Sequence, residues 1–370
     1  MGLLICQVSS NYLLYHITHK QKMADPVVCW CGNADLSPFS SEYSECKSCE
    51  TLVSLTPLTT AQLAVNDDDT DFYGKQYWLN HQRQDLGFPD IRSRSRNDLT
   101  ERNLHWLKVL LKYCLPAADV LEIGCGHGSF VALMQQTGYR ASGVEMSPWV
   151  VSFGHEAFQV PIHLGPVENL DIPLNSLDAI VLMDVLEHLP DPVSTLRCCA
   201  DFLKPEGFLL IQTPEFQENM SYQLLKESQS PFLKMLQADE HLHLFSQKSV
   251  TKCLEQVSLN HIYFEPAIFS AYDMFFIASK THLNAYSTDQ IESTLLAHPH
   301  SRLTLAMLDL RERELALAEA LQESEKDRAE RLNQIILLTQ QLKESEIDRE
   351  ARLNQINTLT KWLEEERGES

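Results

Sequence analysis

Residues 119–128, which read DVLEIGCGHG, place three glycines at alternate positions directly after a short apolar run. Without a Cβ, glycine lets the backbone turn sharply and come close to a ligand. Apolar residues at helical spacing follow the turn, and the first amides of such a helix are unpaired and face the ligand. The stretch predicts a strand, a ligand-binding turn and a helix, although an ordinary strand–turn–helix without a ligand has the same local pattern.

Two acids accompany this turn. Glu122 lies at the end of the predicted strand, just before Gly124. Glu145 ends the next predicted strand, 140–145, about 20 residues further on, where an acid in nucleotide-binding α/β folds takes the ribose hydroxyls. The alternative for Glu145 is a surface acid. A dinucleotide fingerprint has its third glycine one residue later, where this chain has Ser129, so the spacing disfavours a nicotinamide cofactor.

A second polar group follows the apolar run at 177–183. Residues 184–192 read DVLEHLPDP, so that Asp184, Glu187 and His188 come at the end of a predicted buried strand. His241 and His243 occur in EHLHLFS at 240–246. Histidine, with a pKa near neutral, suits general base chemistry. We therefore select His188, His241 and His243 as candidate bases, each of which could instead position substrate or only support the fold.

Four of the ten cysteines lie in one short N-terminal segment. Cys29 and Cys31 form one close pair, and Cys46 and Cys49 form the other. Two such pairs can place four thiolates around one tetrahedral Zn²⁺, which would supply much of the folding energy of so small a unit. The first pair is C-x-C rather than the commoner C-x-x-C, and four unligated or redox cysteines are the alternative.

From residue 119 onward, predicted strands alternate with predicted helices, which indicates an α/β fold with a mostly parallel sheet covered on both faces. Further strands are predicted at 161–164, at 208–214, near 261–266 and at 273–279. An amphipathic helix at 98–114 leads into the first strand of this sheet. Ser147 and Ser246 are predicted helix caps.

These motifs together resemble class I S-adenosylmethionine-dependent methyltransferases. The similarity is carried by acid-x-G-x-G-x-G at 122–128, by the 184–192 string and by the turn KPEG at 204–207, and it covers roughly residues 70–280. It implies a Rossmann-like seven-stranded sheet that binds the cofactor at the carboxyl ends of the strands. The cofactor-binding residues that it implies are Glu122, Gly124, Gly126, Gly128, Glu145, Met146, Val167, Glu168 and Asp184.

The resemblance also implies a role for each part of this set. The three glycines would approach the amino-acid part of the cofactor, and Glu122 would orient the turn or meet the ammonium group. Glu145 would hold the ribose. Residues 165–169, with Val167 and Glu168, lie where related enzymes contact adenine, and Asp184 would lie near the sulfonium.

The cysteine segment resembles the small zinc ribbon that precedes the methyltransferase domain in some enzymes acting on sugars. That similarity favours methyl transfer to a small molecule or glycan, at a sugar hydroxyl. An aromatic cluster with Tyr73 and Tyr77 could line the acceptor pocket as a lid, or could pack as a linker helix. A nicotinamide-dependent oxidoreductase and a non-catalytic interaction protein remain alternatives.

The composition of the chain excludes some classes of binding partner. The chain has 370 residues, 44% of them hydrophobic, and a formal charge of −21, which argues against nucleic acid as a partner and against a polybasic membrane anchor. The sequence has no membrane-spanning run. The scattered cysteines outside the N-terminal segment indicate a reducing compartment, and we predict a cytoplasmic protein. Residues 1–22 lack signal-peptide features, and Met23 could be the natural start.

The C-terminal part differs in composition from the rest. ESEKDRAERLNQIILLTQQLK at 323–343 recurs as ESEIDREARLNQINTLTKWLE at 344–364, with a period of three heptads. Apolar residues follow a heptad stripe that is interrupted by Arg328 and Arg349, which predicts a coiled coil that self-associates or binds a partner helix. A single solvated helix is the alternative.

The sequence predicts five parts of the chain. They are an extension at 1–22, a zinc-ribbon-like segment at 23–56, a linker, lid and helices at 57–117, a cofactor-binding domain at 118–282 and a coiled coil at 302–367.

Overall fold

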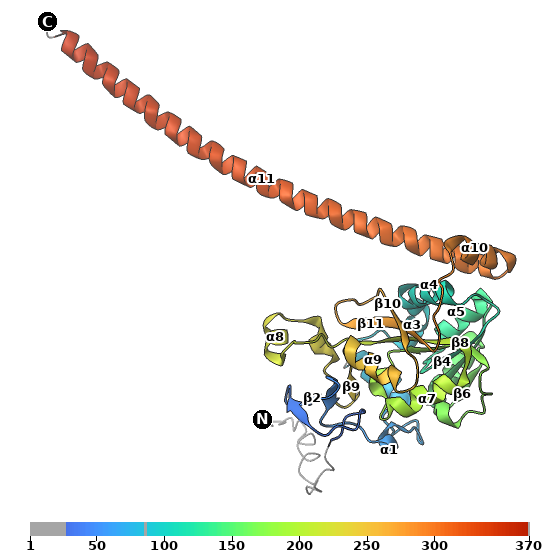
Figure 1. The fold of residues 1–370 in the computed structure, drawn as a ribbon. Helices are drawn as coiled ribbons and strands as arrows, with labels where there is room; N and C mark the ends of the chain where they lie inside the picture. Colours follow the sequence, from blue (N-terminus) through green and yellow to red (C-terminus); the bar gives the residue numbers. More distant parts are fainter. Residues whose placement is uncertain (1–26, 85–86, 369–370) are drawn as a thin grey trace, which may run out of the picture. The chain divides into compact units, whose positions relative to one another are not determined.

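The computed structural model describes residues 27–84 and 87–368 of the chain (Figure 1). The described chain falls into two units, which divide between Met307 and Leu308. The predicted extension at 1–22 lies outside the described residues.

A seven-stranded sheet with the order β10-β11-β8-β7-β4-β5-β6 forms the centre of the first unit. Strands β8, β7, β4, β5 and β6 are parallel to one another, and β11 pairs antiparallel with both β8 and β10. The predicted mostly parallel α/β sheet is confirmed. Its strands are β4 (Asp119–Ile123), β5 (Arg140–Glu145), β6 (Ile162–Leu164), β7 (Leu177–Met183), β8 (Leu203–Pro214), β10 (His261–Glu265) and β11 (Asp273–Ser279).

Strand β4 pairs with both β5 and β7, so these three strands lie side by side. Their register aligns Ile123 with Val144 and with Leu182. Parallel strands end at the same edge of a sheet. The residues that follow β4, β5 and β7 are therefore brought together, although they are far apart in the sequence.

Helices cover both faces of this sheet (Figure 1). Helices α7 (Pro192–Phe202) and α9 (Gln247–Glu255) bury their apolar residues against one face. Helices α4 (Leu104–Tyr113) and α5 (Ser129–Thr137) lie on the other, where the rings of Trp106 and Phe130 have centroids 5.5 Å apart. Helix α6 (Pro148–Phe158) begins at the predicted cap Ser147, and the predicted cap Ser246 begins α9 with a capping box.

The predicted helix at 98–114 is longer and interrupted. It starts as α3 (Ile91–Asp98), passes through a π-helical stretch, η2 (Leu99–Asn103), and continues as α4. Side chains from α3 and η2 lie against the glycine turn. π-Helical stretches of this kind are frequent at functional sites.

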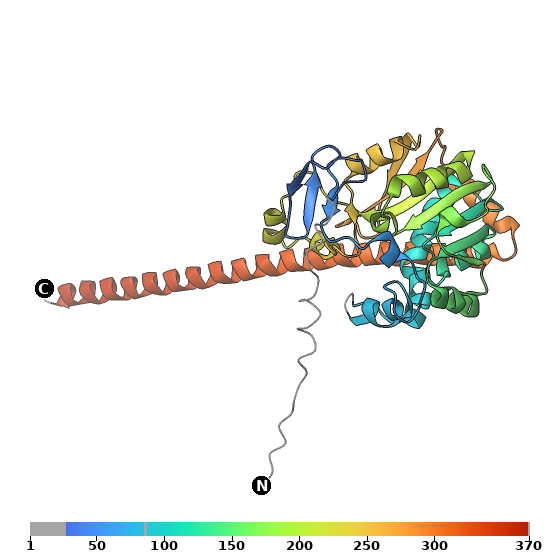
Figure 2. The same cartoon turned by 90° about the horizontal axis from the view of Figure 1, so that it is seen from below.

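A second, smaller sheet joins the cysteine segment to a distant part of the chain. Its order is β1 (Leu36–Pro38), β2 (Tyr43–Cys46), β3 (Leu52–Ser54) and β9 (His243–Leu244). Figure 2 shows these blue strands beside the yellow segment that contains α8 (Tyr222–Glu227) and η5 (Pro231–Met235). The Tyr43 hydroxyl donates to the backbone oxygen of His241 at 2.8 Å. The cysteine segment thus supports the segment that carries His241.

The remaining helices lie before and after these elements. Residues 60–84 contain α1 (Thr60–Leu63), a π-helical turn η1 (Tyr77–His81) and α2 (Gln82–Gln84). Helix α10 (Thr288–Ala297) precedes α11 (Ser301–Gly368), whose apolar side chains are largely exposed, with Leu321 at 62% and Ile335 at 60%. At 1.5 Å per residue, α11 is about 100 Å long. Across the described ranges, no helix combines the length and apolarity needed to cross a membrane.

Candidate functional site

The three glycines after β4 all adopt left-handed backbone conformations, with φ of +66° at Gly124, +51° at Gly126 and +79° at Gly128. A Cβ on Gly126 would lie 3.1 Å from Cη2 of Trp78, whereas one on Gly128 would lie 2.9 Å from Cγ2 of Val160 in the core. Gly126 therefore faces the aromatic segment at 72–81, and Gly128 faces the interior. Helix α5 begins directly after Gly128, which has no side chain to cap it, and its first amide, that of Ser129, donates to Nδ1 of His127 at 3.4 Å.

Glu122 lies beneath this turn and is 4% exposed. Its Oε2 atom has no hydrogen-bond partner among the described residues. Burial, and to a smaller extent the charge of Glu145, raise the pKa of the Glu122 carboxyl well above its ordinary value. A buried carboxylate oxygen without a partner costs free energy unless a donor reaches it. The position suits a cationic or N–H-bearing group placed on the glycine turn.

Glu145 lies at the carboxyl end of β5, next to the turn. It accepts hydrogen bonds from three backbone amides: those of Gly126 at 3.0 Å, Met146 at 2.8 Å and Ser147 at 3.0 Å. Burial raises the pKa of this carboxyl, and the three amides oppose the rise. The amides fix the carboxylate in place. Oε1 accepts two of these bonds, whereas Oε2 accepts one and keeps capacity to accept a further hydrogen bond from a hydroxyl.

The residues expected near adenine lie after β6. Val167 is buried in the core cluster beside β5. Glu168 is exposed, and its carboxylate accepts a hydrogen bond from the Thr195 hydroxyl on α7. Half-buried Met146 follows Glu145 directly. The structure thus places Met146 and Val167 along the β5–β6 edge, and it gives Glu168 a partner within the protein.

Asp184 follows β7 in a left-handed conformation, with φ of +57°. Its Oδ1 accepts from Nε2 of Gln212 at 2.9 Å, and its Oδ2 lies 3.4 Å from Nη1 of Arg102. The Arg102 guanidinium packs 5.1 Å from the centroid of the Phe269 ring. Burial, followed by the charge of Asp184, raises the pKa of Asp273 to about 8. This end of the site therefore brings the carboxylates of Asp184 and Asp273 close to the Arg102 guanidinium.

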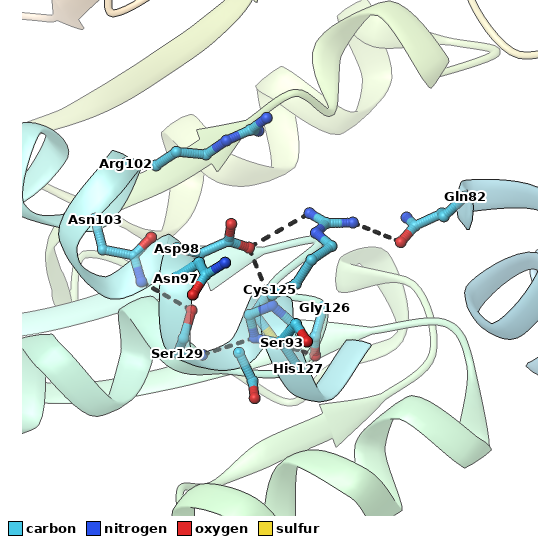
Figure 3. A network of polar contacts seen from close by, with 12 residues as sticks. Gln82, Ser93, Asn97, Asp98, Arg102, Asn103, Cys125, Gly126, His127 and Ser129 are labelled. Carbon is cyan, nitrogen blue, oxygen red and sulfur yellow. Dashed lines mark hydrogen bonds and ion pairs between the residues drawn. The ribbon is translucent and has the colours of Figure 1, made fainter. Parts of the chain in front are cut away.

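A polar network connects α3 to the glycine turn, and sequence reasoning did not single it out (Figure 3). Asp98 lies 3.2 Å from Nε2 of His127, which belongs to the turn, and 3.5 Å from Nη2 of Arg94. Arg94 donates to the side chain of Gln82, next to the aromatic segment. Burial opposes ionisation of Asp98, but His127 and Arg94 outweigh it and lower its pKa. The left-handed turn is thereby tied to the helices that precede it.

Two of the three candidate histidines are in contact with each other. The rings of His188 and His241 have centroids 4.9 Å apart. Tyr73 joins them through its hydroxyl, 3.2 Å from Nδ1 of His188. His243 lies outside the pair, where its Nδ1 is 3.2 Å from the backbone oxygen of Leu189.

The aromatic segment at 72–81 packs beside this pair. The ring of Tyr73 contacts those of Phe72 and Tyr77, with centroids 4.9 Å and 5.0 Å away. The Tyr77 hydroxyl donates to Glu240 at 3.2 Å, and Nε2 of His81 lies 2.6 Å from the same carboxylate. The segment therefore spans from the glycine turn, through Trp78, to the histidine pair.

The four N-terminal cysteines also meet. Their sulfur atoms all lie within 4.8 Å of one another. The Sγ atoms of Cys29 and Cys49 are 3.4 Å apart, and those of Cys31 and Cys46 are 3.5 Å apart. Four thiols gathered in this way suit tetrahedral Zn²⁺, which has Zn–S bonds of about 2.3 Å.

Comparison with known proteins gives a family match over the central sheet. Residues 95–263 match a family described as a methyltransferase domain. The ubiquinone biosynthesis O-methyltransferase of Xanthomonas campestris pv. campestris strain B100 is 34% identical over 111 residues, which cover 28% of this chain and 46% of that protein. The chain spans about half the length of the curated relatives it matches.

Solved structures give similarity over a comparable part of the chain. Magnesium protoporphyrin IX methyltransferase from Synechocystis PCC 6803 with bound SAH is 15% identical, with a TM-score of 0.41, and the match covers 56% of this chain and 97% of that one. Phosphoethanolamine N-methyltransferase 2 of Haemonchus contortus is 16% identical, with a TM-score of 0.40, covering 49% of this chain and 52% of that one. The family match over 95–263 confirms the resemblance that the glycine turn and the 184–192 string carry.

Proposed function

We propose that this chain, whose residues 95–263 match the methyltransferase domain family, transfers a methyl group from S-adenosylmethionine to a hydroxyl of a small molecule or glycan. One observation carries the proposal. Acids stand at the carboxyl ends of three adjacent parallel strands, with Glu122 on β4, Glu145 on β5 and Asp184 after β7, around a glycine turn with left-handed backbone. Open α/β sheets bind their ligands at this edge.

The residues present suit this cofactor. The glycine turn lets the backbone approach the amino-acid part, and the unpartnered Oε2 of Glu122 provides an acceptor for its ammonium group. Glu145, held by three amides, would accept from the ribose hydroxyls. Met146, Val167 and Glu168 would border the adenine, and Asp184 would lie toward the sulfonium. S-adenosylmethionine supplies an electrophilic methyl group, and the protein must align the acceptor with it and exclude water.

The polar groups beyond Asp184 provide an acceptor site. Tyr73, His188 and His241 lie together there, and the imidazole Nε2 atoms can accept a hydrogen bond from an acceptor hydroxyl. The name O-methyltransferase of the Xanthomonas relative supports an oxygen acceptor. The similarity of the cysteine segment to ribbons in sugar-modifying enzymes supports a sugar hydroxyl. His243, which lies outside the pair, is the weakest of the three candidates.

A tritiated-methyl transfer assay tests the proposal. The full chain is incubated with labelled S-adenosylmethionine and with nucleotide sugars, glycans or phenolic small molecules, and label in the acceptor is counted. We expect transfer to one hydroxyl-bearing class, lost in Glu145→Gln. Transfer to protein or nucleic acid alone would contradict the acceptor class, and label transfer that survives Glu145→Gln would contradict the cofactor site.

We further propose that Cys29, Cys31, Cys46 and Cys49 bind one structural Zn²⁺. Their close sulfur atoms support it, and so does the small core around them. The remaining cysteines of the described chain are free thiols, which supports our inference of a cytoplasmic location. Elemental analysis should find one zinc per chain that is lost in Cys46→Ser; zinc retained at full stoichiometry in that variant would contradict the assignment.

We also propose that α11 pairs with α11 of a second copy as a parallel coiled coil. Its apolar residues at 335, 342, 356 and 363 recur at heptad spacing and are at least 50% exposed, which a lone helix in water does not favour. Seam residues Arg328 and Arg349 each follow an acid, Asp327 or Asp348, which in a parallel pair flanks the partner's arginine.

None of the ten cysteines lies beyond residue 253, so engineered cysteines report on this pairing. Leu342→Cys should form a disulfide between chains under mild oxidation, because a seam residue meets its own copy in a parallel pair. Gln340→Cys, on the outer face, is the matched control and should remain a thiol. Equal cross-linking of both variants, or a monomeric mass by light scattering, would contradict the pairing.

A further inference from the structure

Glu187, His188 and His241 form a second cluster of metal-ligating side chains, separate from the cysteines. One ligand atom from each lies within 4.8 Å of the others. Glu187 and His188 come from the 3₁₀ turn η4 (Leu186–His188) after β7, and His241 comes from the segment before β9. Ligand atoms bound at about 2.1 Å to one ion at tetrahedral angles lie about 3.4 Å apart, so atoms up to 4.8 Å apart need to approach by up to about 1.4 Å to close around an ion.

Both imidazole rings are oriented by backbone carbonyls. Nδ1 of His188 lies 2.9 Å from the backbone oxygen of Glu240, and Nδ1 of His241 lies 2.7 Å from that of Met235. A carbonyl oxygen only accepts hydrogen bonds, so each Nδ1 carries the hydrogen, and in the neutral ring Nε2 keeps its lone pair. Histidines that bind metals almost always donate their other ring N–H in this way, which fixes the tautomer and the ring orientation.

The carboxylate of Glu187 is oriented as well, and no lysine or arginine of the described residues forms an ion pair with it. Its Oε2 accepts from the Thr213 hydroxyl at 2.9 Å, and its Oε1 lies 3.9 Å from Nε2 of His188. The side chain is 1% exposed, and His188 is its sole ion-pair partner in the described part of the chain. Asp184 and Asp273 add negative charge nearby. Burying a carboxylate in such surroundings is costly unless a cation or proton accompanies it.

We propose that Glu187, His188 and His241 bind one divalent first-row transition-metal ion through one carboxylate oxygen and the two Nε2 atoms. Imidazole ligands favour such ions over Mg²⁺ and Ca²⁺, and three protein ligands leave coordination positions open. The inference rests on the proposed function for its role, which is to bind the oxygen of the acceptor hydroxyl and to make that hydroxyl more acidic. It predicts acceptors with a second oxygen next to the methylated one, since two open positions can bind both.

The alternative is a structural hydrogen-bond cluster that binds no ion. His243 provides the matched control because it is also buried, and its Nδ1 also faces a backbone carbonyl, that of Leu189 at 3.2 Å. It lies two residues from His241 and is not part of the ligand cluster. A general effect of losing a buried histidine would appear in both His241→Gln and His243→Gln, whereas loss of a ligand would appear only in the first.

Manganese is the probe, because it binds weakly to thiolates and leaves zinc in the cysteine cluster undisturbed. The full chain, loaded with one equivalent of zinc so that only the cysteine cluster is filled, is titrated with Mn²⁺, and free Mn²⁺ is followed by electron paramagnetic resonance. We expect one Mn²⁺ per wild-type chain. In Glu187→Gln and in His241→Gln the dissociation constant should rise at least about tenfold, with His243→Gln unchanged.

Absence of Mn²⁺ binding by the wild-type chain overturns the inference without reference to any variant. Equal binding by His241→Gln and wild type overturns it too, once circular dichroism shows that the variant is folded. S-adenosylhomocysteine binding is measured on the same samples. If this ligand binds and Mn²⁺ does not, the metal inference alone fails, whereas absence of S-adenosylhomocysteine binding contradicts the proposed function itself.

Discussion

The substitution Gly126→Ala should weaken cofactor binding while the protein still folds. The Cβ of Gly126→Ala would lie 3.1 Å from Cη2 of Trp78, where carbon atoms normally keep about 3.5–4.0 Å. The new methyl group therefore stands between the turn and the aromatic segment, where the cofactor's amino-acid part is proposed to bind. The left-handed backbone, with φ of +51°, adds about 1 kcal/mol of strain.

Alanine substitutions at two other glycines show how much stability backbone strain and overpacking each cost. Gly87 also has a positive φ, +73°, but its Cβ would have nothing within 4 Å, so Gly87→Ala reports the backbone strain alone. On Gly128 the Cβ would lie 2.9 Å from Val160 and 3.0 Å from Ile162, so Gly128→Ala adds overpacking to strain and should lower the free energy of unfolding by about 3 kcal/mol.

The assay combines urea unfolding with calorimetric titration of S-adenosylhomocysteine. Gly126→Ala should lose about 2 kcal/mol of stability, about 1 kcal/mol more than Gly87→Ala because Trp78 must also move, while its dissociation constant rises at least about tenfold, or about 1.4 kcal/mol. Gly87→Ala should bind like wild type. Binding by Gly126→Ala at wild-type affinity would refute the reasoning that the turn faces the cofactor.

Three further predictions concern neighbouring groups. Glu145→Gln should reduce S-adenosylhomocysteine affinity at least about tenfold in the same titration, since a charged acceptor for the ribose hydroxyls is lost; unchanged affinity would refute the ribose assignment. Trp78→Phe should cost about 1 kcal/mol of stability through lost packing, because Nε1 has no hydrogen bond to lose among the described residues. It should weaken that ligand about fivefold by removing a donor, and unchanged affinity would show that Nε1 does not reach the ligand. Asp98→Asn should cost about 2 kcal/mol at pH 7, because Arg94 and His127 lose their charged partner. The pKa of Asp98 is lowered in the folded state, so the stability that its charge contributes is complete above the unfolded-state pKa of about 3.9 and is lost as pH falls through the folded-state pKa. Urea unfolding at pH 7 and at pH 3 should therefore give a smaller difference between wild type and Asp98→Asn at pH 3. Equal differences at the two pH values would contradict this.

The sequence was informative where local pattern and chemistry coincide. Continuous apolar runs predicted β4 and β7, and Ser147 and Ser246 were recognisable caps because their side chains act on amides three residues away. The acids of the site were found because each lies at the end of a predicted strand or directly after it. Strand order in a parallel sheet then brings Glu122, Glu145 and Asp184 to one edge.

Contacts between distant segments could not be predicted in this way. The pairing of β3 with β9 joins residues almost 200 positions apart, and each strand is too short to carry a periodic signal. The link from Arg94 through Asp98 to His127 joins a helix to a turn that follows it much later in the sequence, and no periodicity shows this contact. The sequence indicates His188 and His241 as separate candidates. Their rings come into contact because the segment before β9 folds back toward the end of β7.

Parallel calorimetric titrations of the full chain with S-adenosylmethionine and with NADH show which cofactor the glycine turn binds. We expect one S-adenosylmethionine bound per chain and no heat from NADH, because Ser129 stands where a dinucleotide site needs its third glycine. Binding of NADH, or failure of the folded chain to bind S-adenosylmethionine, would contradict this expectation.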